Sequence, residues 1–200
     1  MRDRIIETAA EMMLREGYTQ VSMKGIADAV GLAKPSLYHY FSGKEELFEA
    51  VVDLFFREGG KWTAVFLRPD LSFKEALRQM FGYFTELIEY MDHLLDDRQK
   101  GKYGYYYLLV DALRMFGRVR EQYEQAYRND FEIIQKAVKK AIKNKEIRED
   151  INWESLAAML SAMMEGGLML STLYPSLNVG QLSEGYFEIL WNGIKVQADA

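Results

Sequence analysis

Three lysines and several hydroxyl groups stand close together between Ser22 and Lys44, in the segment SMKGIADAVGLAKPSLYHYFSGK. The segment contains three basic residues, Lys24, Lys34 and Lys44, and one acidic residue, Asp28, so its local charge is +2. Residues 1–50 as a whole carry 6 basic and 8 acidic residues, so the positive charge is concentrated in this segment. Ammonium and hydroxyl groups bind phosphate oxygens well. The segment is therefore a candidate phosphate-binding surface.

A helix, a tight turn and a second helix are expected to present these groups. Ser22 is a favourable N-cap for a helix over residues 23–30, and Gly31 can supply the left-handed conformation that ends it. A second helix is predicted over residues 34–41. The inward-facing residues of the pair are Ile26, Ala27, Val30, Leu37 and Phe41. The outer face of the second helix is polar or amphipathic: Lys34, Ser36, Tyr38, His39 and Tyr40.

This N-terminal stretch resembles the DNA-binding segment of the tetracycline-repressor (TetR) family. The matching positions are Ala9, Ala10, Gly17, Tyr18, Ser22, Ile26, Ala27, Gly31, Leu37, Tyr38, Tyr40, Phe41, Lys44, Glu45 and Leu47. A match over about 45 residues is more specific than a short motif. The resemblance implies an all-α homodimeric repressor that binds a palindromic operator through three N-terminal helices and a small molecule through its C-terminal body. Ala33 and Pro35 depart from the commonest family pattern, which affects the expected operator sequence and not the binding mode.

The resemblance also implies which residues touch double-stranded DNA, with the helix that begins at Lys34 in the major groove. The residues assigned to base edges are Lys34, Pro35, Ser36 and His39. The residues assigned to phosphates are Ser22, Lys24, Tyr38, Tyr40 and Lys44. The alternative is that the two tyrosines are packing residues and that Lys44 is an ordinary first-turn lysine.

Helical periodicity runs through nearly the whole chain, and we find no convincing alternating strand. Start and stop signals predict about nine helices, near residues 2–16, 23–30, 34–41, 44–67, 71–95, 102–117, 119–145, 152–173 and 179–197. The fold class is therefore all-α. We expect a helix-turn-helix DNA-binding domain over residues 1–47 and an effector-binding and dimerisation domain over residues 48–200.

The predicted helix over residues 44–67 joins these two domains. It contains no breaker except Gly59 and Gly60. A continuous helix would act as a lever that transmits movement in the body to Lys44. The alternative is that the two glycines only permit close packing.

The body is rich in aromatic and methionine side chains, which are more often core than pocket. Tyr105, Tyr106 and Tyr107 are consecutive, however, so they cannot all face the core. Asp111 and Arg114 lie amid apolar neighbours and could orient a ligand. We expect a small, largely apolar or aromatic effector, with candidate contacts at Trp62, Phe66, Phe84, Tyr106, Tyr107, Asp111, Arg114 and Met115.

The last two predicted helices carry small and apolar residues that indicate a two-fold four-helix bundle formed by two copies of the chain. The candidate interface residues are Met163, Gly167, Leu182, Tyr186, Ile189 and Gly193. The alternative is burial within one chain. A lysine stripe at positions 136, 139, 140 and 143 is interpreted as a solvated face rather than an anion site.

Composition argues against an enzyme and against a cofactor or metal. The chain has no Cys and 2 His, which excludes a disulfide scaffold and a thiol nucleophile. One acidic group could suggest a metal site: Glu86, Glu89, Asp92, His93, Asp96 and Asp97. One histidine and no fixed ligand spacing make this group a charged helix end instead. A further alternative is a dimeric small-molecule- or partner-binding helical protein without DNA function, against which the intact basic surface argues.

The N-terminus lacks the features of a secretory signal, and we expect a cytoplasmic protein. Residues 156–173 form the most membrane-like stretch, but Glu165 and two glycines interrupt it. We interpret it as a buried helix rather than a membrane span. The net charge of −5 argues against a nucleic-acid coat protein and leaves room for a local basic surface.

Overall fold

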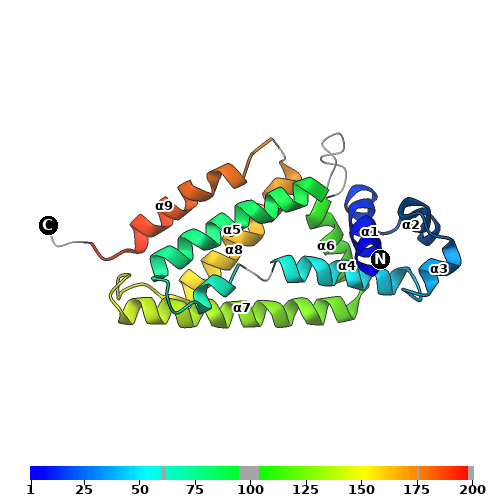
Figure 1. Ribbon diagram of the computed structural model, residues 1–200. Helices are drawn as coiled ribbons and strands as arrows, with labels where there is room; N and C mark the ends of the chain where they lie inside the picture. Colours follow the sequence, from blue (N-terminus) through cyan, green and yellow to red (C-terminus); the bar gives the residue numbers. More distant parts are fainter. Residues whose placement is uncertain (60–61, 95–103, 175, 198–200) are drawn as a thin grey trace. The chain divides into compact units, whose positions relative to one another are not determined.

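The computed structural model describes residues 1–59, 62–94, 104–174 and 176–197. These residues form helices and no β-strand, as Figure 1 shows. The helices are α1 (Arg2–Glu16), α2 (Met23–Val30), α3 (Lys34–Tyr38), α4 (Lys44–Gly59), α5 (Phe73–Leu94), α6 (Gly104–Met115), α7 (Gly117–Lys143), α8 (Trp153–Leu173) and α9 (Ser183–Ile194). Two short 3-10 segments, Ala64–Leu67 and Gly180–Leu182, lie before α5 and α9. The predicted all-α fold is confirmed.

The chain packs as two compact units. Unit 1 comprises Met1–Glu58 and Tyr90–Gln122, and unit 2 comprises Gly59–Glu89 and Tyr123–Ala200. The expected functional division at residues 47 and 48 stays a prediction, because these units reflect packing and not function.

The core of unit 1 forms around the apolar face of α1. The buried residues are adjacent pairs that repeat every four residues, which places them on one side of the helix. They are Ile5, Ile6, Ala9, Ala10, Met13 and Leu14. Leu37 from α3 and Phe41 after it are buried in the same unit. Three rings add to this core: Phe48 lies 4.5 Å from Tyr18 and 5.1 Å from Phe116, centroid to centroid.

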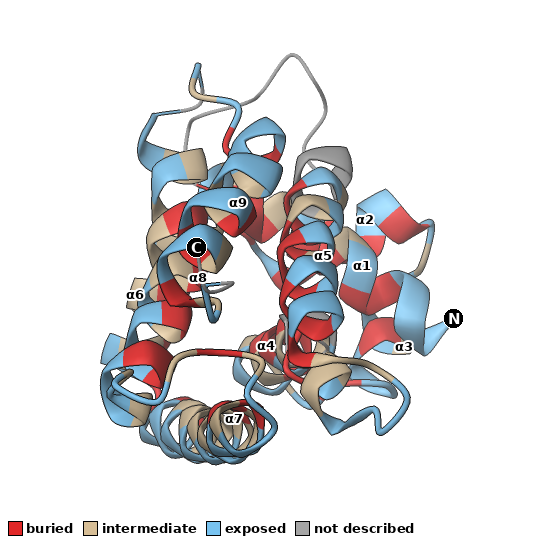
Figure 2. Cartoon of the chain, turned by 90° about the vertical axis from the view of Figure 1, so that its left-hand side faces the viewer, coloured by how far each residue is buried: buried red, intermediate tan, exposed pale blue. Residues whose placement is uncertain are grey.

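The core of unit 2 is organised by α5. This helix carries its buried residues along one side and its exposed residues along the other (Figure 2). Phe84 on the buried side packs directly against Gly167 of α8: a Cβ atom built on that glycine would lie 2.1 Å from the ring. The absence of a side chain at Gly167 therefore lets α8 approach α5 closely.

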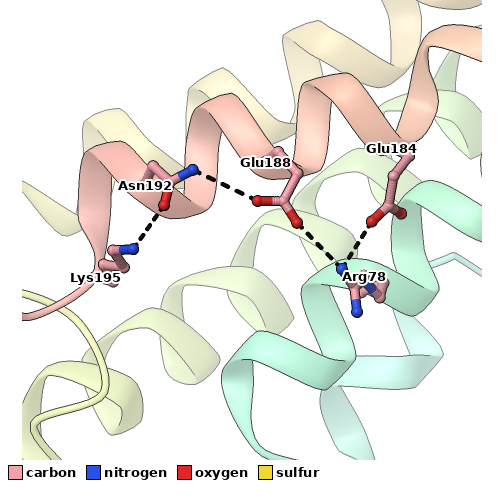
Figure 3. A network of polar contacts seen from close by, with 5 residues as sticks. All are labelled: Arg78, Glu184, Glu188, Asn192 and Lys195. Atoms are coloured by element: carbon pink, nitrogen blue, oxygen red, sulfur yellow. Dashed lines mark hydrogen bonds and ion pairs between the residues drawn. The ribbon is translucent and has the colours of Figure 1, made fainter.

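Helix α9 is attached to α5 by polar contacts on the outside of unit 2 (Figure 3). The Arg78 guanidinium of α5 donates to Glu184 at 2.7 Å and to Glu188 at 3.2 Å. It also lies 4.5 Å from the centroid of the buried Phe187 ring. Exposed ion pairs contribute little individually, so the apolar contact under the guanidinium matters as much as the charges.

One predicted helix is wrong. The helix expected over residues 44–67 ends at Gly59, and a separate 3-10 segment covers Ala64–Leu67. Glycine is about 1 kcal/mol less favourable than alanine inside a helix. Two consecutive glycines, Gly59 and Gly60, therefore weaken the helix enough for it to end there. The helix is therefore not continuous to residue 67, and the transmission of movement to Lys44 through the first turns of α4 stays a prediction.

Other predicted boundaries shift by one to four residues, including the end of α3 and the start of α9. Helix α3 ends at Tyr38 rather than at residue 41, although the Phe41 N–H still donates to the Leu37 carbonyl at 3.2 Å. The last helix begins at Ser183 rather than at residue 179. There the Thr85 hydroxyl donates to the Gly180 carbonyl at 3.1 Å, which favours a short 3-10 segment ahead of α9.

Candidate functional site

The helix-turn-helix geometry expected around α2 and α3 is present. The Ser22 hydroxyl caps α2 by accepting a hydrogen bond from the Gly25 N–H at 3.0 Å. Gly31 ends α2 with φ of 73°, and the Leu32 N–H reaches back to the Ala27 carbonyl at 2.8 Å. This left-handed turn directs the chain into α3.

Helix α3 is fixed in unit 1 by its buried Leu37, which has no exposed surface. The chain on either side presents polar groups outward. Tyr38 is 43% exposed and Tyr40 is 40% exposed, so a large part of each side chain stays accessible for contacts outside the chain. The Lys34 ammonium lies 5.8 Å from the Tyr38 ring centroid, which keeps a cation beside the phenol.

The loop after α3 is also fixed. The carboxylate of Glu46 accepts hydrogen bonds from the backbone N–H and the hydroxyl of Ser42, both at 2.7 Å. These bonds, the backbone one first, lower the pKa of Glu46. The loop therefore joins α3 to α4 in one defined geometry.

All nine predicted DNA-contact residues belong to unit 1. The exposed ones are Ser22, Lys24, Lys34, Pro35, Tyr38, His39 and Tyr40. Ser36 and Lys44 are half-buried. The structure thus brings the predicted set onto one helix-turn-helix unit, while its contact with DNA stays a prediction.

Lys44 has a partner within the chain. Its ammonium donates to the Thr19 carbonyl at 3.2 Å and lies 4.3 Å from the Tyr18 ring centroid. Burial lowers the pKa of Lys44. An ammonium has three donors, so the same group can hold the end of α1 against α4 and still bind a phosphate.

The predicted effector contacts divide between the two units. Trp62, Phe66 and Phe84 belong to unit 2. Trp62 and Phe84 are buried, and Phe66 is half-buried with its ring 5.7 Å from that of Phe73. The remaining candidates, Tyr106, Tyr107, Asp111, Arg114 and Met115, belong to unit 1, where Tyr107, Arg114 and Met115 are exposed.

Unit 1 contains a narrow apolar cleft between α4 and α6. Its lining residues are Val52, Phe55, Phe56, Tyr105, Leu108 and Leu109. The free space in it is about 10 Å³, no more than one water molecule requires. A ligand could enter only if these side chains moved, and none of the eight predicted effector contacts lines the cleft.

An apolar groove of about 360 Å³ lies between α8 and α9. Four of the predicted interface residues line it: Met163, Tyr186, Ile189 and Gly193. Ile189 is 77% exposed, which is unusual for an isoleucine. Gly167 is buried against Phe84 and Leu182 is exposed near the start of α9, so these two do not line the groove.

Sequence reasoning missed a polar cluster in unit 2. Tyr123 and Tyr127 of α7 have their hydroxyls 3.1 Å apart, and the Tyr123 hydroxyl donates to the Glu165 carboxylate of α8 at 3.2 Å. Two signals were available: tyrosines spaced by four residues, and an acid inside an apolar helix. The sequence alone could not show that they meet.

The acidic group considered as a metal site and the lysine stripe of α7 can be checked in part. Among the described residues, no group of three or more His, Cys, Asp or Glu side chains is arranged to hold a metal. The side chains of Asp92 and His93, and residues 96 and 97, lie outside the described part. In the lysine stripe, the Lys139 ammonium lies 3.5 Å from the ring centroid of Trp153.

Helix α8 is long and apolar enough to cross a membrane by length and composition. Such a helix also occurs in the core of soluble proteins. Its buried residues are Leu156, Ala157, Leu160, Met164, Gly167 and Leu168. They face the interior of unit 2, and the absence of a membrane partner stays a prediction.

Comparison with known proteins agrees with this geometry. The family model described as "Bacterial regulatory proteins, tetR family" matches residues 5–51, and the model described as "Tetracyclin repressor-like, C-terminal domain" matches residues 105–181. Together the two models cover more than half of the chain. The first match spans the complete helix-turn-helix and the first half of α4.

One curated relative is the HTH-type transcriptional activator FasR of Mycolicibacterium smegmatis. It is 32% identical over 89 residues, which are 44% of this chain and 41% of FasR. The chain thus spans less than half of the length of FasR, and the same holds for two further curated relatives, both repressors.

Two solved structures cover nearly the whole chain. A TetR-family transcriptional regulator from Cytophaga hutchinsonii is 21% identical with a TM-score of 0.73, covering 98% of this chain and 96% of its own. A transcriptional regulator from Saccharomonospora viridis, solved in complex with choline, is 22% identical with a TM-score of 0.75, covering 98% of both chains. At these identities the likeness shows the fold alone.

Proposed function

Because the chain belongs to the tetR family of DNA-binding transcriptional regulators and is not an enzyme, we propose that it is a cytoplasmic, homodimeric repressor. In this proposal its affinity for operator DNA is modulated by a small effector. Residues 1–47 form the DNA-binding domain, and residues 48–200 bind the effector and a second copy of the chain.

The observation that carries the DNA-binding proposal is the exposed outer face of α3. Its one fully buried side chain is Leu37, and Lys34, Pro35, Tyr38 and His39 remain free to meet DNA. A helix in the major groove reads bases with its outward side chains. The lysines and tyrosine hydroxyls nearby are suited to phosphates.

Selection of DNA fragments by the purified full-length protein tests this proposal. We expect a pseudo-palindromic duplex, bound less tightly as salt rises because lysines displace counterions. His39→Ala and Ser36→Ala should alter the preferred sequence, whereas Lys24→Ala should weaken all sequences alike. A folded protein that selects no duplex at low salt would overturn the proposal.

Dimerisation is supported by the groove between α8 and α9. Two-fold symmetry lets one apolar face cover its own copy, and the exposed Ile189 and the groove-lining Met163 supply such a face. A symmetric dimer also matches a palindromic operator. Its half-sites would be about one helical turn apart or a multiple of that distance.

Repression and effector control are proposed from the family. Curated relatives include both repressors and the activator FasR, so the sign of regulation needs a direct test. A reporter gene placed behind the selected operator tests the sign of regulation. Lower expression in the presence of the protein supports repression, and higher expression would make it an activator. Ligands that change this expression identify effectors.

A further inference from the structure

Arg2 opens α1 and contacts the chain just after α3. Its guanidinium carbon lies 4.8 Å from the centroid of the Phe41 ring. Phe41 is only 1% exposed, so its ring is a fixed support for the guanidinium. The start of α1 lies beside α3 in two views of unit 1 (Figures 1 and 2). Arg2 is therefore next to the candidate DNA-binding surface, although it lies far from that segment in the sequence.

The contact with Phe41 leaves the hydrogen-bond donors of Arg2 available. A guanidinium carries five N–H donors, and the ring attracts its charge without offering an oxygen to accept them. Arg2 is exposed, and no hydrogen-bond acceptor or ion-pair partner for it is apparent in the part of the chain that the structure describes. A supported guanidinium with unused donors is well suited to the oxygens of a phosphate.

The same edge of unit 1 carries a negative charge. Glu46 accepts two hydrogen bonds from Ser42, which directly follows Phe41. These bonds and, after them, the charge of Arg2 lower the pKa of Glu46 and keep its carboxylate ionised. An ionised carboxylate repels a phosphate that comes close. Arg2 offsets this repulsion at the edge where the DNA backbone would pass.

Arg2 and Lys44 form a pair of cations held by aromatic rings. Arg2 lies at the start of α1, whereas Tyr18, whose ring faces the Lys44 ammonium, follows the end of α1. The loop between α3 and α4 is thus tied to both ends of α1. Since α1 has 15 residues and is about 22 Å long, the two cations are placed to meet different phosphates.

We propose that Arg2 is a further DNA contact, which binds a backbone phosphate beside the bases that α3 reads. The proposal deepens the proposed function and rests on its DNA-binding part. The nine contacts predicted from the sequence lie between Ser22 and Lys44 and do not include Arg2. Because phosphate is common to all sequences, Arg2 contributes affinity and not sequence preference.

Binding titrations of the full-length protein at several salt concentrations test this contact. The probes are the duplex selected by the wild type and a duplex of scrambled sequence. Arg2→Gln should weaken binding to both at least about fivefold at low salt, because charge-assisted hydrogen bonds are lost. The slope of log affinity against log salt should fall by about 1 for each bound subunit. Arg2→Lys keeps the charge and should retain the slope.

Arg4→Gln is the matched control. Arg4 is exposed in the same turn of α1, and two residues along a helix rotate a side chain by about 200°. This variant removes the same charge without touching the Phe41 contact, so its salt slope should stay close to that of the wild type. Thermal melting shows whether each variant is folded. The loss caused by Arg2→Gln should also persist in a Glu46→Gln background, because the contact is with phosphate and not only with Glu46.

Equal affinity and equal salt slope for the wild type and Arg2→Gln would overturn the proposal and leave the proposed function intact. Three other results would also overturn it: a lower melting temperature of Arg2→Gln with an unchanged slope, equal losses in Arg2→Gln and Arg4→Gln, or a loss that disappears in the Glu46→Gln background. A folded wild type that binds neither duplex would overturn the proposed function together with this contact.

Discussion

The ammonium of Lys44 lies 4.3 Å from the centroid of the Tyr18 ring, so the first residue of α4 is tied to the segment that follows α1. The bond from the same ammonium to the Thr19 carbonyl strengthens this tie. Lys44 is therefore both a structural residue of unit 1 and a candidate phosphate contact.

This double role predicts two separable effects of Lys44→Ala. The melting temperature should fall, because the variant loses a cation–π contact worth about 1 kcal/mol. The slope of log affinity against log salt should also fall by about 1 for each lysine that neutralises a phosphate. Thermal melting and binding titrations at several salt concentrations measure the two effects.

Lys24→Ala is the matched control, because Lys24 is exposed and no contact of it within the chain is apparent in the described residues. It should reduce the salt slope without changing the melting temperature. If Lys44→Ala lowers stability but leaves the salt slope unchanged, Lys44 is a structural residue only.

The two adjacent glycines of α8 give a second matched pair. Gly167→Ala should destabilise the protein by about 1–3 kcal/mol, because the added methyl group overlaps the Phe84 ring and forces repacking. Gly166→Ala has no atom within 4 Å of the added carbon and should be neutral or stabilising by up to about 1 kcal/mol. Urea denaturation measures both, and equal effects would contradict the close packing of α8 on Phe84.

Ile189 provides the test of the dimer. Ile189→Glu should dissociate the subunits, because a charge in an apolar interface costs several kcal/mol, roughly the penalty of a buried ion. The folded monomer should be little affected, since Ile189 is already 77% exposed in a single chain. Sedimentation at micromolar concentration measures the assembly.

Gln181→Glu is the control for added charge, because it lies at an exposed position just before α9 and outside the groove. It should leave the dimer intact. A wild-type protein that sediments as a monomer would show that the groove has another role.

Sequence patterns predicted most helices because helix ends depend on local residues. Ser22 and Gly31 illustrate this, since the hydrogen bonds at these two helix ends join residues that are at most five apart in the sequence. The end of α4 at Gly59 was missed because a glycine pair can either be tolerated in a helix or end it, and tertiary packing decides.

Contacts between distant helices were the part that could not be predicted. The absence of a side chain at Gly167 indicated that another element approaches closely. Only the fold shows that this neighbour is Phe84 of the same chain. In the same way, the acid at Glu165 was visible in the sequence, but its meeting with Tyr123 requires the packing of α7 on α8.

The pH dependence of stability gives the last prediction. Burial raises the pKa of Glu165 in the folded state above its unfolded value. The folded protein therefore holds this proton more tightly, and the resulting stabilisation is complete below the unfolded pKa and is lost as pH rises through the folded pKa.

Glu165→Gln carries no titrating proton at this position. The melting temperature of the variant relative to the wild type should thus become more favourable as pH rises from about 4 to 8, with each 1 kcal/mol giving about 2–4 °C. Taking the difference between the two proteins cancels carboxylates such as Glu46 and Glu75, whose pKa values are lowered and whose stabilisation is lost on acidification. A difference that stays constant over this pH range would contradict the desolvation of Glu165.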